Sequence, residues 1–213
     1  AEMIPNARFE IVPTGIDLKR FEEGDGRKIK EKFPDKKIIL HVGRVVREKN
    51  IELIIKAAPR ILKKIDAVFI IVGEGPHKDT LEKMVKEKHL SPHFIFTGFV
   101  DDRELMDYYK AADVFAFPSK YETQGLVALE AMAAGVPVVA AREKALPDFI
   151  RDGENGYLAD ANDEMEFAEK VMRAMEERDV VARARKFVMD YSAERMAEKL
   201  EEVYEKYGDK MQD

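Results

Sequence analysis

The run K-I-I-L-H-V-G at residues 37–43 is followed by a similar run, A-V-F-I-I-V-G, at residues 67–73. The centre of each run is apolar at consecutive positions rather than at alternating ones. Both faces of each strand are therefore expected to be covered by helices, as in a parallel sheet. Between the two runs, apolar residues recur at three- and four-residue spacing, which predicts a helix over residues 50–64. The two runs together predict a β-α-β unit.

The same alternation continues along the rest of the chain. Further strands are predicted at 94–98, 113–118, 136–140 and 156–158, and further helices at 77–88, 102–111, 126–134, 146–151, 164–176, 180–190 and 193–206. Alternating strands and helices predict an α/β fold with an open, doubly wound parallel sheet. Ligands of such sheets bind beyond the carboxyl ends of the strands. The loops expected to hold a site are therefore 43–50, 73–76, 98–101, 118–125 and 141–146.

The composition of the chain excludes several classes of protein. The 213 residues include 36 Lys and Arg against 42 Asp and Glu, a net charge of −6, so no broad cationic surface for nucleic acid is expected. The sequence has no Cys for disulfide or thiolate chemistry. Its apolar runs are far shorter than the ~20 residues that span a bilayer. The four His residues lack metal-ligand spacing, so no metal site is expected.

The loop G-R-V-V-R-E-K-N at 43–50 concentrates the cations Arg44, Arg47 and Lys49 just before a predicted helix. Asn50 is expected to cap that helix, because Asn is a favoured N-cap residue. In an acidic protein the cluster favours a local anion site. The alternative is a solvated surface on which Glu48 neutralises one of the cations.

The loop V-G-E-G-P-H at 72–77 bears a partial likeness to a dinucleotide-binding fingerprint. Gly73 and Gly75 follow a predicted strand, but Lys78 stands where the third glycine belongs. A tight turn between strand and helix is therefore favoured over the phosphate loop of a dinucleotide-dependent oxidoreductase.

The segment P-S-K-Y-E-T-Q-G-L-V-A-L-E-A-M-A-A-G at 118–135 places Glu122 and Glu130 on either side of Gly125, where a helical pattern begins. Backbone N–H groups of Gly125 and Leu126, at the positive end of that helix, suit an anion. A carboxylate on each side accepts hydrogen bonds from paired hydroxyls. This layout matches a nucleotide sugar, which has a ribose, a diphosphate and a hexose. A surface Glu122 with Glu130 paired to a cation is an equal alternative at this point.

These segments, with F-T-G-F-V at 96–100 and the V-P-V-V that follows at 136–139, closely resemble the C-terminal domain of glycosyltransferase family 4 (group 1). This family contains the retaining GT-B enzymes. The resemblance covers nearly the whole chain, from V-P-T-G-I-D at 12–17 to the helical pattern that follows Tyr191. It implies an interdomain linker at 1–30 and a Rossmann-like domain that binds a nucleotide sugar at 31–190. A C-terminal helix at 191–213 would return towards an N-terminal domain missing from this sequence.

The resemblance also implies roles for the matched residues. Arg44 and Lys49 correspond to the cations that hold the donor diphosphate, Glu122 to the acid near the transferred sugar, and Glu130 to the acid on the ribose. Arg44, Lys49 and Glu122 are the expected catalytic residues. The other expected substrate-binding residues are Gly43, Gly73, Phe99, Val100, Thr123, Gln124, Gly125 and Leu126. Fixed cations and helix N–H groups would stabilise the leaving group in place of a metal ion, so no cofactor is expected.

The implied activity is hexose transfer from a nucleoside diphosphate sugar, with a UDP-sugar favoured and a GDP-sugar as the alternative. The acceptor, a glycan or a lipid, would be held by the missing domain, so the fragment alone is expected to be inactive. Nucleic acid is not an expected partner. The expected location is cytoplasmic, with membrane-surface association through the missing domain. A retaining phosphorylase, a sugar-nucleotide epimerase and a non-catalytic nucleotide-sugar-binding module are the alternatives.

Overall fold

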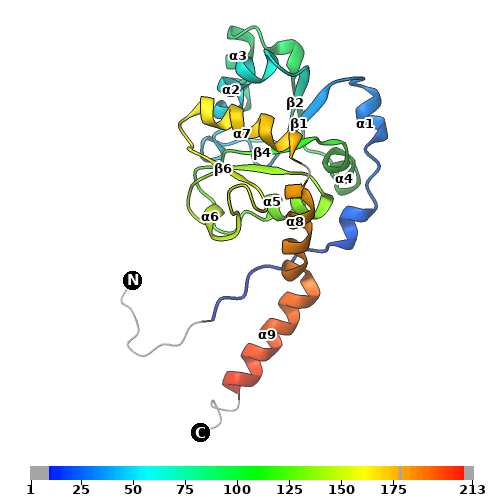
Figure 1. Cartoon of the computed structure of the whole chain (residues 1–213), viewed down its shortest axis with the longest axis vertical. Helices are drawn as coiled ribbons and strands as arrows, with labels where there is room; N and C mark the ends of the chain where they lie inside the picture. The colour runs from blue at the N-terminus through cyan, green and yellow to red at the C-terminus, as the bar shows by residue number, and fades with distance from the viewer. Residues whose placement is uncertain (1–9, 178, 209–213) are drawn as a thin grey trace.

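The computed structural model describes residues 10–177 and 179–208, which form a six-stranded sheet covered by helices on both faces (Figure 1). All neighbouring strands pair in parallel, in the order β3-β2-β1-β4-β5-β6. The order reverses at β1, where a doubly wound sheet opens a crevice for ligands. The predicted doubly wound, Rossmann-like sheet is confirmed. The strands are β1 (Lys37–Val42), β2 (Ala67–Val72), β3 (Phe94–Gly98), β4 (Val114–Phe117), β5 (Val138–Ala141) and β6 (Tyr157–Ala159).

Helices connect the strands, and further helices precede the first strand and follow the last one. The predicted helices at 102–111, 126–134 and 164–176 have the predicted bounds, and the others differ by at most two residues at either end. The α-helices are α1 (Arg27–Glu31), α2 (Glu52–Leu62), α3 (Lys78–Glu87), α4 (Asp102–Ala111), α5 (Leu126–Ala134), α6 (Leu146–Phe149), α7 (Glu164–Glu176), α8 (Asp179–Val188) and α9 (Ala193–Gly208). Short 3-10 helices are η1 (Lys19–Glu22), η2 (Arg47–Lys49), η3 (Ser91–His93) and η4 (Met189–Tyr191).

The consecutive apolar residues of the strands serve two separate cores. Ile38 and Leu40 pack in a cluster with residues of α4, α5 and α8, whereas Ile39 packs on the opposite face with residues of α2, α3 and α7. All three side chains are at most 1% exposed. Burial of each such side chain contributes roughly 1.5–3 kcal/mol. Both faces of the central strand are therefore covered, which explains why its apolar pattern does not alternate.

The segment that enters the domain and the helix that leaves it are joined. Ile16 N–H donates to the Tyr191 carbonyl at 2.9 Å, and Ala193 N–H donates to the Ile16 carbonyl at 2.9 Å. Within the predicted linker, Phe21 is buried and packs edge-on against Tyr109, with ring centroids 5.8 Å apart. Residues 1–9 of that linker and 209–213 of the predicted C-terminal helix lie outside the described residues. The proposed boundaries at 30 and 191 stay predictions.

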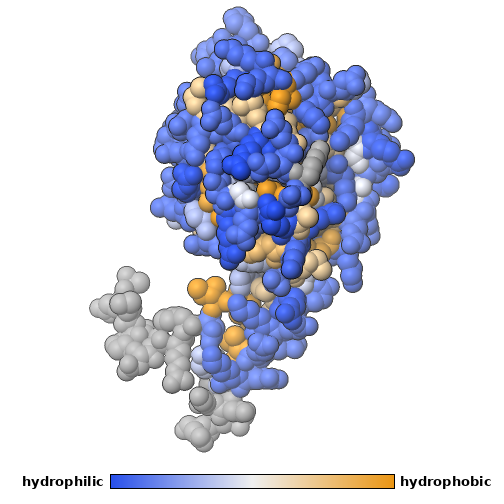
Figure 2. Space-filling view, in the orientation of Figure 1, coloured by the Kyte–Doolittle hydropathy of each residue, from blue (hydrophilic) through white to orange (hydrophobic). Residues whose placement is uncertain are grey.

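The α9 helix extends away from the body of the sheet (Figure 1). The visible face of the body is mostly hydrophilic, and apolar side chains gather where α9 leaves it (Figure 2). Leu200 and Tyr204 on α9 are 41% and 68% exposed. None of the helices formed by residues 10–177 and 179–208 is both long enough and apolar enough to cross a membrane.

Candidate functional site

Two adjoining cavities lie beyond the carboxyl ends of the central strands. The first, named here the α5 cavity, has a volume of about 330 Å³ and is lined by Val42, Gly43, Arg44, Lys49 and residues 122–127. The second, named the β3 cavity, has a volume of about 320 Å³ and is lined by Val42, Gly43, Arg44, Val72, Gly73, Glu74, Phe99, Val100 and Leu105. Both cavities share Val42, Gly43 and Arg44. Four of the five loops predicted to hold a site contribute to these walls.

Lys49 and Glu122 contact each other in the wall of the α5 cavity. The Lys49 ammonium forms an ion pair and hydrogen bond with Glu122 Oε1, and the two side chains are 20% and 12% exposed. The Lys49 ammonium also lies 5.7 Å from the centroid of the Phe117 ring. Arg44 is exposed and lines both cavities. An anion that enters the α5 cavity therefore meets two cations, one of which is already shared with a carboxylate.

The N-terminus of α5 forms another wall of this cavity. Gly125 precedes the helix with φ +65°, and a Cβ there would lie 2.9 Å from Leu146 Cδ2 and 3.0 Å from Phe149 Cζ. Glycine is thus required for both the backbone angle and the close packing. The first N–H groups of any helix have no acceptor inside it and carry partial positive charge. The wall beside Lys49 is therefore a second source of positive potential.

The loop that carries Lys49 is bonded to the loop that carries Glu122. Lys120 N–H donates to the Glu48 carbonyl at 2.8 Å, and the Ser119 hydroxyl donates to the same carbonyl at 3.3 Å. Asn50 Nδ2 donates to the Pro118 carbonyl at 3.1 Å. These bonds join segments about seventy residues apart in sequence and hold them at one side of the α5 cavity.

The expectation that Asn50 caps a helix is wrong. Asn50 adopts a left-handed conformation, φ +53°, at the end of η2, and α2 begins at Glu52. Its amide donates instead to the carbonyls of Pro118 and Ala161. Asn50 stands just before α2, where a capping residue is expected, but its side-chain amide donates hydrogen bonds to two carbonyls that are distant in sequence.

The β3 cavity is shaped by backbone. Gly73 has φ +125°, and a Cβ there would lie only 2.1 Å from the Gly43 carbonyl oxygen. Gly73 N–H donates to the Gly98 carbonyl at 2.9 Å, and Gly43 N–H donates to the Val72 carbonyl at 3.0 Å. Phe99, at the rim, is 80% exposed. The predicted residues Gly73, Phe99 and Val100 are thus brought together with Gly43 and Arg44.

Glu130 stands apart from the other predicted residues, because the linings of the two cavities do not include it. Its Oε2 accepts a hydrogen bond from the Tyr109 hydroxyl at 2.9 Å, between α5 and α4. Burial raises the pKa of Glu130 and also the pKa of Tyr109. A contact between Glu130 and a ribose stays a prediction.

His41 is a polar residue of β1, and its Nε2 would lie 3.7 Å from a Cβ on Gly43, which lines both cavities. The side chain is fully buried in β1, and its Nδ1 lies 2.9 Å from the Ala116 carbonyl. Burial lowers its pKa to about 4, so the imidazole is neutral at pH 7 and Nδ1–H donates to that carbonyl. Nε2 is buried and has no hydrogen-bond partner among the described residues. The only sequence signal was a polar residue at the centre of a buried strand.

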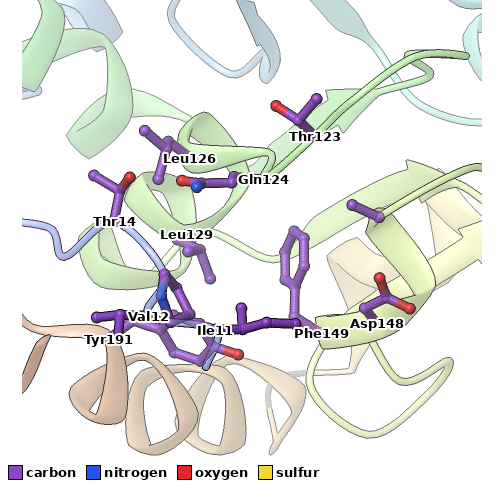
Figure 3. A pocket seen from close by; sticks show the side chains of 12 residues that line it. Ile11, Val12, Thr14, Thr123, Gln124, Leu126, Leu129, Asp148, Phe149 and Tyr191 are labelled. Carbon is purple, nitrogen blue, oxygen red and sulfur yellow. The ribbon is translucent and has the colours of Figure 1, made fainter. Parts of the chain in front are cut away.

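A third cavity, of about 220 Å³, is also lined by Thr123 and Gln124 (Figure 3). It shares these two residues and Leu126 with the α5 cavity, and its wall includes Phe149 and Asp148. The two predicted loop residues therefore line two cavities.

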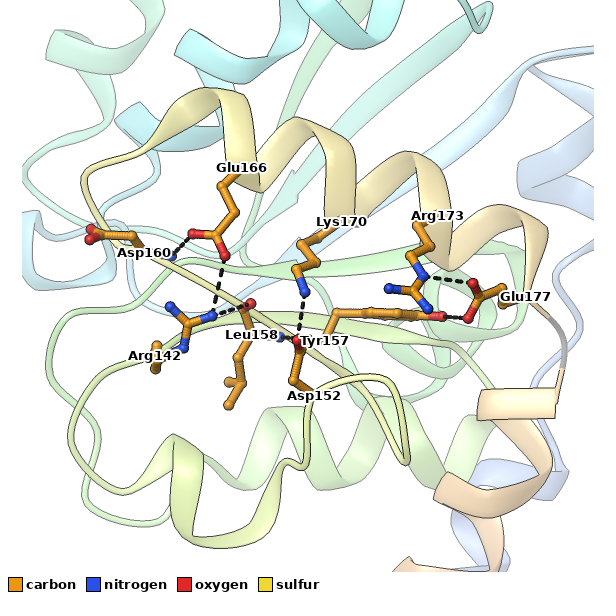
Figure 4. Close-up of polar contacts among 9 residues, drawn as sticks. All are labelled: Arg142, Asp152, Tyr157, Leu158, Asp160, Glu166, Lys170, Arg173 and Glu177. Carbon is orange, nitrogen blue, oxygen red and sulfur yellow. Dashed lines mark hydrogen bonds and ion pairs between the residues drawn. The ribbon is translucent and has the colours of Figure 1, made fainter.

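A polar network on α7 and β6 is formed by residues that line neither the α5 cavity nor the β3 cavity (Figure 4). Lys170 pairs with Asp152 at 2.6 Å, and Arg142 pairs with Glu166 at 3.2 Å. Asp152 also accepts from Leu158 N–H at 2.9 Å, and Arg142 donates to the Leu158 carbonyl at 3.1 Å, so the two pairs fasten the edge strand β6 to α7. The described part of the chain also contains no group of three acidic or His side chains that could hold a metal ion.

Comparison with known proteins identifies the family. The model described as Glycosyl transferases group 1 matches residues 23–189. The chain is 34% identical over 171 residues to the GDP-mannose-dependent alpha-(1-6)-phosphatidylinositol monomannoside mannosyltransferase of Mycolicibacterium smegmatis. That match covers 75% of this chain and 45% of the relative, so the chain spans less than half the relative's length.

Solved structures agree with this result. The C-terminal domain of a glycosyl transferase group 1 family protein, LpcC from Francisella tularensis, is 32% identical with a TM-score of 0.73, over 82% of this chain and 97% of that one. A TarM variant from S. aureus, in complex with fondaparinux, alpha-GlcNAc-glycerol and UDP, is 28% identical with a TM-score of 0.71, over 93% of this chain and 38% of that one. The chain belongs to the glycosyl transferases group 1 family, and its fold is that of a GT-B C-terminal domain, as the motifs predicted.

Proposed function

We propose that this chain is the donor-binding half of a retaining glycosyltransferase, which transfers a hexose from a UDP-sugar or a GDP-sugar to an acceptor held by another domain. One observation carries the proposal. Lys49, Glu122 and the start of α5 line one cavity, and that cavity adjoins a second one walled by glycine backbone. The family assignment supports it, as do a relative named for GDP-mannose and a related structure that contains UDP.

The diphosphate is assigned to the α5 cavity. Arg44, Lys49 and the first N–H groups of α5 supply positive charge there. Negative charge grows on the diphosphate as the glycosidic bond breaks, and groups already fixed in position stabilise that charge without reorganisation. In this proposal, these fixed groups take the place of a metal ion.

The hexose is assigned to the side of Glu122, Thr123 and Gln124, and the nucleoside to the β3 cavity. When the diphosphate binds Lys49, the Glu122 carboxylate is released to accept hydrogen bonds from sugar hydroxyls. The backbone of Phe99 and Val100 contacts the base, and Glu130, oriented by Tyr109, contacts the ribose. The acceptor oxygen bonds to the anomeric carbon from the face that the diphosphate leaves, as the bond between that carbon and the diphosphate breaks. The departing diphosphate takes the hydroxyl proton, and the anomeric configuration is retained without a covalent enzyme intermediate.

The acceptor domain and the location of the whole protein are also proposals. An N-terminal domain would hold a glycan or lipid acceptor, and residues 191–213 would return towards it. The expected location is the cytoplasm or the cytoplasmic face of the membrane. The chain on its own would bind nucleoside diphosphate and transfer no sugar.

Calorimetry with UDP, GDP and ADP tests this proposal. One of the three should release heat, and Lys49→Ala should weaken its binding by about 1–3 kcal/mol, the range for charge-assisted hydrogen bonds, while affecting the free nucleoside less. Lys83→Ala, which removes an exposed lysine paired with Glu87 on α3, is the matched control and should change nothing. No heat with any of the three, or equal losses for diphosphate and nucleoside, would contradict the assignment.

A further inference from the structure

We propose that Asn50 is a positioning residue, whose side-chain amide holds the Lys49 loop against the Glu122 loop and so sets where Lys49 meets the donor diphosphate. The link to the diphosphate rests on the proposed function. The link between the two loops rests on geometry alone.

Asn50 occupies the corner between η2 and α2. Its φ of +53° and ψ of +36° are left-handed, a conformation that Asn tolerates better than most residues. Asn50 N–H donates to the Arg47 carbonyl at 3.0 Å, and the Asn50 carbonyl accepts from Leu53 N–H at 2.9 Å. The backbone of Asn50 therefore ends one short helix and starts the next, which leaves its side chain free for contacts elsewhere.

The side chain uses both of its N–H groups. Nδ2 donates to the Pro118 carbonyl at 3.1 Å and to the Ala161 carbonyl at 2.9 Å. Pro118 directly follows β4, and Ala161 follows β6 by two residues. One amide thus joins the loop after β1 to the ends of two other strands. Aspartate could not replace it, because a carboxylate would face two carbonyl oxygens with no hydrogen to donate.

Lys49 lies between two anchored residues. On one side, the Glu48 carbonyl accepts from Lys120 N–H and from the fully buried Ser119 hydroxyl. On the other side, Asn50 is bonded to Pro118. Anchors on both flanks restrict the backbone at Lys49. Its ammonium, 73 residues from Glu122 in sequence, is thereby held against that carboxylate.

The test distinguishes the effect of losing the Asn50 side chain from the effect of changing its backbone angle. Asn50→Gly keeps the left-handed conformation and removes both hydrogen bonds. We expect UDP binding to weaken about tenfold and uridine binding less than about twofold, since the change acts through the charged site. His89→Gly is the matched control, because His89 is an exposed residue with φ +57° at the end of α3, and it should change neither affinity.

A double-mutant cycle with Lys49→Ala distinguishes positioning from general loosening. If Asn50 acts through Lys49, Asn50→Gly should cost less than about twofold in UDP affinity once Lys49 is absent. A loss that is fully additive in the double variant overturns the proposal, as does an Asn50→Gly protein that binds UDP like the wild type. If Asn50→Gly does not fold, Ser119→Ala replaces it, and should weaken UDP binding by about two- to threefold.

Amide hydrogen exchange gives a readout without ligand. Lys120 N–H, bonded to Glu48, should exchange faster in Asn50→Gly than in the wild type or in His89→Gly. Unchanged exchange overturns the proposal even if no nucleotide binds. Faster exchange, together with a wild type that binds no nucleoside diphosphate, supports the link between the loops and contradicts only the proposed function.

Discussion

The α5 cavity and the β3 cavity share three residues but are built from different parts of the chain. The α5 cavity is held by side chains, namely the Lys49–Glu122 ion pair and the bonds of Asn50 and Ser119 to neighbouring loops. The β3 cavity is held by the close approach of glycine backbone, with Gly73 against Gly43 and Gly98. In the proposed function, the first receives the charged groups of the donor and the second receives the nucleoside.

Because of this difference, substitutions in the α5 cavity should change ligand affinity, whereas substitutions in the β3 cavity should change the stability of the fold. A side chain that faces the α5 cavity can be replaced without altering the strand ends, so such changes should act on ligand affinity. A side chain added at Gly73, in the wall of the β3 cavity, has no space beside the Gly43 backbone, so this change should act on stability.

Gly73→Ala should have the largest effect, because the added Cβ would lie 2.1 Å from the Gly43 carbonyl oxygen, at a φ of +125°. We expect the free energy of unfolding to fall by about 3 kcal/mol or more, measured by urea denaturation. Gly153→Ala is the matched control, since Gly153 also has a positive φ, +77°, but nothing within 4 Å of an added Cβ. It should cost about 1–2 kcal/mol from the backbone angle alone. Equal losses would show that the close approach is unimportant.

His41, buried in β1, should make stability depend on pH. Its folded pKa is about 4, against an ordinary value of 6.5, because burial disfavours the imidazolium. As pH falls below 6.5 the unfolded chain takes up a proton that the folded chain does not. The free energy of unfolding should therefore decrease between pH 6.5 and 4, by up to about 3 kcal/mol.

Denaturation of His41→Leu over the same pH range provides the comparison. This variant should be less stable at pH 7, because the Ala116 carbonyl loses its donor, but its stability should change less between pH 6.5 and 4. An identical pH dependence in both proteins would rule out His41 as the source.

Glu122→Gln should have the smallest effect, and one of opposite sign. A diphosphate must compete with the Glu122 carboxylate for Lys49, so removal of that charge should strengthen UDP binding, by up to about 1 kcal/mol in calorimetry. A UDP-sugar should gain less, because it loses a carboxylate contact to its hydroxyls. Glu87→Gln, in the exposed pair with Lys83, should leave both affinities unchanged. Weaker UDP binding would mean that Glu122 orients Lys49 rather than competes for it.

The sequence predicted the elements well where a local pattern determined them. Apolar runs buried on two faces marked the strands, and the loops after β1, β2, β3 and β4 line the two cavities as expected. Contacts between segments that are far apart in the sequence could not be predicted from local patterns. The Lys49–Glu122 pair and the bonds of Asn50 join residues 68 to 111 positions apart, so the local sequence alone predicts a helix cap at Asn50. The hydrogen bond from Tyr109 to Glu130 was missed for the same reason.

The bridge between Ile16 and Ser192 has a consequence for how such proteins evolve. The chain enters and leaves the domain at one point, where a Cβ on Gly15 would lie 2.6 Å from Ala193 Cα. Any domain joined upstream of residue 10 would therefore need to fit only the junction formed by Ile16 and Ser192. That junction is far along the chain from Lys49 and Glu122. Exchange of such a domain by recombination would leave the α5 and β3 cavities intact.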